Sequence, residues 1–155
     1  MALKQLTWRL IFPLTIILFG SITKWWYVLP VDAPDTMMAG FPLAFISDGW
    51  HTSMSFQIFI AELLIDFIVY FSLCFLFTFL VHRYMKKIKI PILVTILLWT
   101  FSTIILGIAI WIASFTEQVI ETRRDWDMKV MTTGYKFTWM HQGRPDFSKD
   151  DPNKK

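Results

Sequence analysis

Two acidic residues, Glu62 and Asp66, lie inside a run that is otherwise apolar, "AELLIDFIVYF" over residues 61–71. Carboxylates within membrane segments are rare, and they recur in proton and ion pathways. On a helix, residues four apart share one face at about 6 Å, and Tyr70 continues that face by one further turn. This spacing indicates one use for the acids, which is proton or cation transfer along a helix face.

A structural use of the same acids is the alternative. A carboxylate near the middle of a bilayer costs roughly 2.5–3.5 kcal/mol, which a partner must offset. Lys24, near the outer end of the first apolar run, is the obvious partner for Glu62. We therefore expect an intramembrane polar cluster of Lys24, Glu62, Asp66 and Tyr70, with structural pairing and conduction as its competing uses.

Other kinds of site have little support in the sequence. His51, His82 and His141 show no metal-ligand spacing, and neither a nucleophile motif nor a glycine-rich phosphate loop is present. The single cysteine, Cys74, excludes an internal disulfide. We expect no catalytic residue, no metal and no cofactor, and therefore not an enzyme. An outer-leaflet enzyme or lipid-binding site at Asp48 and His51 stays open as a third hypothesis.

The composition indicates a membrane protein. Of the 155 residues, 55% are apolar and 17% are charged, whereas soluble domains average about 45–50% and about 25%. Fifteen Phe and eight Trp suit a bilayer, which accommodates Phe in its core and Trp at its interfaces. The net charge of +3 is modest and no nucleic-acid motif is recognisable, so we expect no nucleic-acid partner.

Three apolar segments are long enough to cross a hydrocarbon core of about 30 Å as helices. They cover about residues 10–29, 56–82 and 91–115. The fold class we predict is therefore an all-α integral membrane protein, with a three-span domain over residues 1–115, an external loop, and an extramembrane tail over residues 116–155.

The tail is expected to have two parts. Val119, Trp126 and Val130 fall near helical spacing, which predicts an amphipathic extension of the third helix. The following "YKFTW" alternates aromatic and polar residues, as a short strand or an interfacial segment would. Residues 141–155 are polar and without periodicity, and we expect them to be disordered.

Basic residues predict the orientation. Cytoplasmic loops retain Lys and Arg, whereas short translocated loops lack them. The loop before the second span contains only acidic charges, and the one after it contains a basic cluster that could also hold anionic lipid head groups. We expect a bacterial cytoplasmic membrane, with the N-terminus inside and the C-terminus outside. The basic cluster comprises Arg83, Lys86, Lys87 and Lys89.

The leading functional hypothesis is a small accessory or anchor subunit without chemistry of its own. Two external segments, "MMAGFPLAFI" and "YKFTW", carry aromatic residues that a lone protein would expose. Besides membrane lipids, we expect other membrane-protein subunits or further copies of the chain as partners. The alternative is an oligomeric proton or cation conductor that uses Glu62 and Asp66. The expected partner-binding residues are Phe41, Phe45, Tyr135, Phe137 and Trp139.

Overall fold

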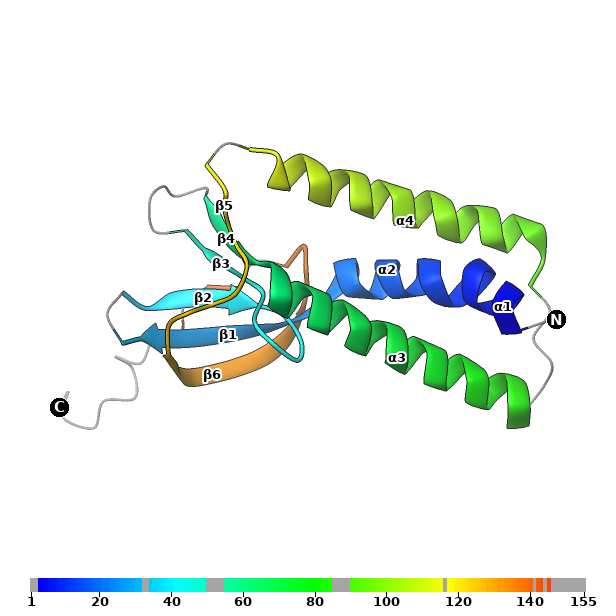
Figure 1. The fold of residues 1–155 in the computed structure, drawn as a ribbon, viewed down its shortest axis with the longest axis horizontal. Coiled ribbons are helices and arrows are strands. Elements are labelled where there is room, and N and C mark those ends of the chain that lie inside the picture. The colour runs from blue at the N-terminus through cyan, green and yellow to red at the C-terminus, as the bar shows by residue number, and fades with distance from the viewer. Residues whose placement is uncertain are drawn as a thin grey trace.

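The protein consists of a group of helices and a β-sheet placed end to end (Figure 1). The sheet lies at one end of the helices, and the N-terminus lies at the other. The computed structural model describes residues 3–31, 34–49, 55–84, 90–115, 117–140, 142–143 and 145.

The helices form a layer in which α2 packs against both α3 and α4. The N-terminal helical run is continuous, because a π-helical turn, η1, joins α1 to α2. The α2 and α4 helices approach closely at Gly20, where an added Cβ would lie only 2.4 Å from Ile105 Cγ2. Ser102 on α4 also donates a hydrogen bond to the Pro13 carbonyl at 2.9 Å. The helical elements are α1 (Leu3–Leu6), η1 (Thr7–Ile11), α2 (Phe12–Ser21), α3 (Ile60–Tyr84) and α4 (Ile92–Ala113).

The sheet has six strands in the order β5-β4-β3-β2-β1-β6. All neighbours are antiparallel except β4 and β5, which run parallel. Two strands are continuous with helices: α2 runs directly into β1, and β4 runs directly into α3. These two junctions attach the sheet to the helices without a flexible linker. The strands are β1 (Ile22–Pro30), β2 (Thr36–Ala39), β3 (Ile46–Asp48), β4 (Phe56–Phe59), β5 (Val119–Glu121) and β6 (Met128–Phe137).

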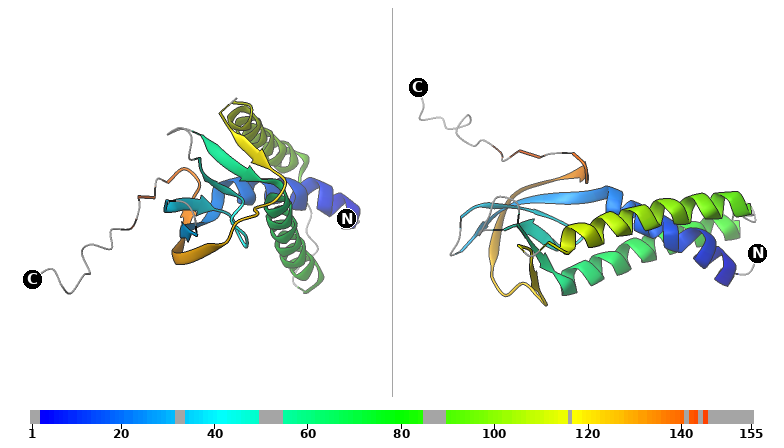
Figure 2. Two further views of the ribbon diagram at one scale, coloured as in Figure 1. Left: turned by 60° about the vertical axis from the view of Figure 1, so that its left-hand side comes forward. Right: turned by 90° about the horizontal axis from the view of Figure 1, so that it is seen from above.

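The sheet is curved, as the length of one connection requires. Strands lie about 4.8 Å apart, so the outer strands of a flat six-stranded sheet would be roughly 24 Å apart. The segment 122–127 joins these edges, and fully extended it would reach roughly 23–25 Å. Because it bends at Thr122, Arg123 and Trp126, the sheet must curl to bring β5 and β6 together (Figure 2).

The connecting segment covers one face of the curved sheet. In Figure 1 it passes in front of the strands, from β5 to β6. Trp126 from this segment packs on the core of the sheet, with its ring edge-on to Phe59 at 6.1 Å. The buried core residues beneath it are Val28, Met38, Ala44 and Phe59.

The predicted all-α fold class is wrong, because the chain forms a mixed structure of helices and a six-stranded sheet. Among the residues that the structure describes, two helices, α3 and α4, are long and apolar enough to cross a membrane, rather than the three we expected. The segment predicted at residues 10–29 is helical only to Ser21 and continues as β1. β-Branched and aromatic side chains dominate β1, and such residues favour a pleated strand once neighbouring strands pair with it.

The other predicted elements also differ from the structure. Residues 56–59 form β4, so the helix expected at 56–82 begins at Ile60 instead. The amphipathic helix expected in the tail is absent from its described residues: Val119 lies in β5 and Val130 in β6. Pairing with the rest of the sheet outweighs the weak helical periodicity there. The disorder expected at residues 141–155 falls almost entirely outside the described residues.

Candidate functional site

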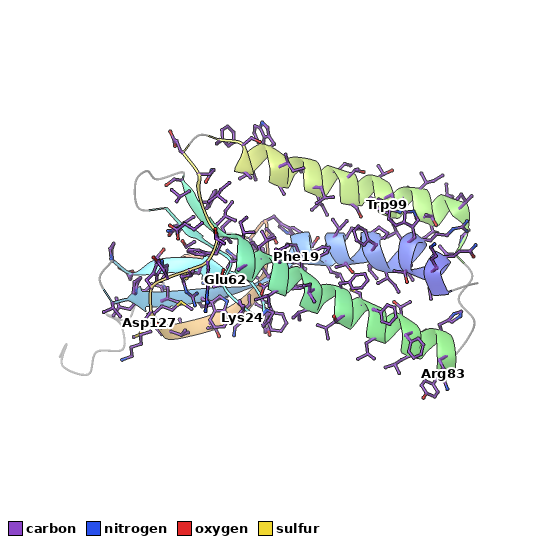
Figure 3. All side chains as sticks on the ribbon, in the orientation of Figure 1. Phe19, Lys24, Glu62, Arg83, Trp99 and Asp127 are labelled. Carbon is purple, nitrogen blue, oxygen red and sulfur yellow. The ribbon has the colours of Figure 1, made fainter. Side chains whose placement is uncertain are left out.

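The two acids lie at the sheet-proximal end of α3, where helices and sheet meet (Figure 3). Glu62 is in the first turn of the helix and is 8% exposed, while Asp66 follows one turn later and is completely buried. A carboxylate in the first turn interacts favourably with the positive end of the helix dipole. The fold therefore places the acids near a helix N-terminus, close to loops that supply amide donors.

Asp66 holds the turn between β2 and β3. Its Oδ1 accepts a hydrogen bond from the backbone N–H of Leu43 at 2.9 Å, whereas Oδ2 has no hydrogen-bond partner among the described residues. The turn begins at Gly40, whose φ of 147° suits glycine, and an added Cβ there would lie 2.0 Å from the Leu43 carbonyl oxygen. Asp66 thus ties a tightly folded turn of the sheet to the helix.

Aromatic side chains surround this turn. The Tyr70 hydroxyl donates to the Ile22 carbonyl at 2.8 Å, which links α3 to the start of β1. Phe19 and Phe41 both meet the Tyr70 ring edge-on, and Phe45 stacks on Phe19 at 5.3 Å. The turn, the end of α2 and α3 therefore form one packed junction.

Glu62 makes a second connection, to the segment that crosses the sheet. Its Oε1 accepts a hydrogen bond from the backbone N–H of Arg124 at 3.3 Å. The Arg124 guanidinium lies over the Trp126 ring at 5.5 Å. Glu62 Oε2 and Arg124 Nη1 are buried and have no hydrogen-bond partner among the described residues. Both acids thus accept hydrogen bonds from backbone amides in loops that fold back onto α3.

Lys24 does not belong to this arrangement. It lies on β1, and its ammonium group sits 3.6 Å above the centre of the Trp26 ring. The described contacts of the two carboxylates are with backbone amides, so the expected Lys24–Glu62 ion pair is not found among them. The expected pair assumed that residue 24 lies at the outer end of a helix. Because residues 22–30 form a strand instead, the Lys24 side chain lies on the Trp26 ring.

The five expected partner-binding residues fall into two groups. Phe41 and Phe45 are partly buried in the junction described above. Tyr135 and Phe137 lie on β6, Trp139 lies two residues beyond its end, and all three are exposed. Phe41 contacts Tyr135 at 5.8 Å, so the groups adjoin.

Several expected features lie partly outside the described residues. Arg83 is exposed at the end of α3 that is remote from the sheet, but Lys86, Lys87 and Lys89 are not described (Figure 3). His51 is likewise outside the described residues, so the third hypothesis has no geometry. Among the residues that the structure describes, no three His, Cys, Asp or Glu side chains gather as a metal site would require.

The loop amides that bind the acids have no signal of their own in the sequence. The Gly-Phe-Pro sequence at residues 40–42 was a signal for a turn, but nothing in it indicates that Leu43 reaches Asp66. Arg124 lies in the same stretch as Trp126, for which the sequence predicts a helical extension. Their roles depend on the crossing of segment 122–127 over the sheet, which local periodicity cannot reveal.

Known proteins give no guide to this site. No family model matches the chain, and neither a curated protein nor a solved structure is significantly similar to it.

Proposed function

We propose that this protein is a membrane-anchored accessory subunit, with α3 and α4 in the bilayer and a sheet that binds a partner protein. The observation that carries the proposal is the exposure of both helices. A core helix of a soluble protein would be largely buried and a signal sequence would lie near the N-terminus, yet α3 and α4 are mostly unburied and lie further along the chain.

The exposed surface of these helices is apolar over its length. Soluble monomers rarely expose contiguous apolar patches above a few hundred Å², and larger ones mark membrane or protein contacts. On α3 and α4, large apolar side chains are more than half exposed from one end to the other, and hydrocarbon suits such a surface far better than water. Examples are Leu64, Ile68 and Phe77 on α3, and Ile92, Phe101 and Ile110 on α4.

The distribution of basic residues supports an orientation with the sheet outside. Lys4, Arg9 and Arg83 belong to the helical elements at the end remote from the sheet, and in the sequence three further basic residues, Lys86, Lys87 and Lys89, follow Arg83. The sheet end contains acidic and basic residues in mixture, and Arg124 is partly buried against Trp126. Since positive charge favours the cytoplasmic side, the N-terminus is inside in this proposal. The helical run over residues 3–21, which packs against α3 and α4 and leads directly into β1, then lies in the bilayer beside them.

The partner binds at the outer edge of β6. This long strand pairs with β1 on one side and, among the described residues, has no neighbour on the other. An exposed strand edge presents free amide and carbonyl groups, and addition of a partner strand is a common mode of recognition. The opposite edge, β5, spans only Val119–Glu121 and offers far less backbone.

Charge favours a different protein over a second copy at this edge. Lys129 and Lys136 each lie one position in from an end of β6, Met128–Phe137. Two-fold antiparallel pairing of the whole strand with its copy would therefore put Lys129 of each chain opposite Lys136 of the other. Like charges directly opposite destabilise such a pair. We infer that the partner supplies an extended segment with acidic residues.

Photo-crosslinking in the native membrane tests this proposal. We expect benzoylphenylalanine at Thr133, exposed on β6, to crosslink a second protein that also copurifies stoichiometrically in mild detergent. The matched control is the same group at Ile120, exposed on β5, which should give no such product. A monodisperse particle containing this chain alone, or crosslinks only between copies, would overturn partner binding.

Conduction through Glu62 and Asp66 receives less support from the geometry. Each carboxylate accepts a backbone amide at the sheet-proximal end of α3, which suits a structural role. Measurement of proton flux in liposomes separates the two uses: an Asp66→Asn variant should show the same flux as the wild type. A flux that is present in the wild type and lost in this variant would favour conduction instead.

A further inference from the structure

The end of β6 carries a compact group of exposed apolar side chains. Phe137 is 45% exposed, Trp139 71% and Met140 52%. The Phe137 and Trp139 rings stack nearly parallel, 4.9 Å apart and inclined by 8°. These residues do not belong to the buried core of the sheet. Their shared exposure needs an external surface to account for it.

Hydrogen bonds fix this group beside the helices. The Thr138 N–H donates to the carbonyl of Ser21, the last residue of α2, at 2.9 Å. Phe137 pairs in register with Ile22, and the Met140 N–H closes a turn onto the Phe137 carbonyl at 2.9 Å. Backbone contacts therefore hold the group where α2 passes into β1, so it is no loose extension.

Tyr70 shows at which height along α3 the group lies, because its hydroxyl donates a hydrogen bond to the carbonyl of Ile22, which pairs with Phe137. Tyr70 lies roughly 15 Å from the start of α3 at 1.5 Å per residue. The helix, with 25 residues, is about 37 Å long, and exceeds a hydrocarbon core of about 30 Å. If the basic end of α3 marks the inner boundary, the outer boundary lies roughly 10 Å or less from Tyr70.

We propose that Phe137, Trp139 and Met140 form an interfacial anchor that inserts into the leaflet on the sheet side. The occupant is the lipid surface, because the group is apolar, exposed and held beside the helices at the depth where interfacial side chains insert. Such residues bury about 5–10 Å into the boundary between head groups and acyl chains, and Trp is enriched there. This inference rests on the proposed membrane anchoring.

The anchor acts through apolar insertion. Lys136 is the only charged residue between Tyr135 and Met140, so binding does not depend on anionic lipid. Insertion fixes the tilt of the sheet, since β6 is bonded to β1 along its whole length. The partner-binding edge of β6 would then stand at a defined angle to the membrane.

Nitroxide accessibility in phosphatidylcholine vesicles tests the anchor. In a Cys74→Ser background, Trp139→Cys and Met140→Cys are each spin-labelled, and collisions with oxygen and with a water-soluble nickel chelate are compared. Two further labelled variants calibrate depth: Ile68→Cys on exposed α3 and Thr133→Cys on β6. Both anchor positions should give an oxygen-to-nickel ratio severalfold above that of Thr133→Cys and below that of Ile68→Cys.

The calibrating variants separate failure of the anchor from failure of the membrane proposal. If Ile68→Cys reports hydrocarbon while both anchor positions report water, the anchor is wrong and membrane insertion stands. Low accessibility to both reagents at residues 139 and 140 would indicate a protein contact and would also overturn the anchor. If Ile68→Cys itself reports water, both proposals fall together.

Discussion

The Asp66 carboxylate accepts a hydrogen bond from the backbone N–H of Leu43 at 2.9 Å, and this bond joins helix α3 to the turn between β2 and β3. Asp66 is fully buried, so the bond lies inside the junction between helices and sheet. An acid in an apolar run thus serves as a hydrogen-bond acceptor for a backbone amide of this loop. Its removal should affect the loop before it affects the helix.

The first prediction concerns this acceptor. Asp66→Asn retains an oxygen for the Leu43 amide, whereas Asp66→Leu leaves that amide unpaired. An unsatisfied buried donor costs about 1–3 kcal/mol, and because Leu43 is 37% exposed we expect the lower end, about 1 kcal/mol or roughly 5-fold in local opening. Hydrogen exchange at Leu43 should accelerate in Asp66→Leu and stay near the wild-type rate in Asp66→Asn. Equal exchange in the two variants would show that the bond does not hold the turn.

A second prediction addresses the conformation of the turn. Gly40→Ala introduces a Cβ 2.0 Å from the Leu43 carbonyl oxygen, at a φ of 147° that other residues rarely adopt. The conformational strain alone costs on the order of 1–3 kcal/mol. We expect a clear loss of thermal stability in detergent. Gly107→Ala is the matched control, since nothing lies within 4 Å of its added Cβ, and it should be neutral or stabilising.

The contact between α2 and α4 gives a third prediction. Gly20→Ala should destabilise the protein because its Cβ would lie 2.4 Å from Ile105 Cγ2. Ile105→Ala removes the obstructing methyl group, so the double variant should lose less stability than the sum of the single variants. A double-mutant cycle on thermal unfolding measures this coupling. Simple additivity would mean that the helices separate at this point to admit the methyl group.

The fourth prediction tests the segment that crosses the sheet. Trp126→Ala removes the ring that packs on the core beside Phe59, and should cost up to about 3–5 kcal/mol in detergent. Trp126→Phe keeps an aromatic ring and should lose much less. Trp139→Ala, which removes an exposed ring, should change the free energy of unfolding by less than about 0.5 kcal/mol. A similar loss for both alanine variants would contradict the assigned core.

The sequence predicts the apolar helices far better than it predicts the sheet. Long uncharged runs carry their own signal, and the run at 91–115 contains the observed helix Ile92–Ala113. Strands such as Ile46–Asp48 are too short to show alternation, and they exist through pairing with distant residues. Residues 22–30 directly follow an apolar helix, so their composition alone assigns them to the outer end of a membrane-spanning helix.

The sequence predicts the two acids of the candidate site but not the backbone amides that donate hydrogen bonds to them. Glu62 and Asp66 stand out because they interrupt an apolar run. Their acceptor roles depend on the amides of Leu43 and Arg124, and backbone donors carry no sequence signature. Lys24 was the obvious charge to pair with them, yet β1 directs it onto Trp26.

The most direct test of the account is the side of the membrane on which the sheet lies. In a Cys74→Ser background, Asp127→Cys places a thiol on the exposed segment that crosses the sheet (Figure 3). Tyr84→Cys places one at the last residue of α3, remote from the sheet. With a membrane-impermeant maleimide, intact cells should label Asp127→Cys at once and Tyr84→Cys only after permeabilisation. Labelling of both from the same side would contradict a sheet anchored across the bilayer by α3 and α4.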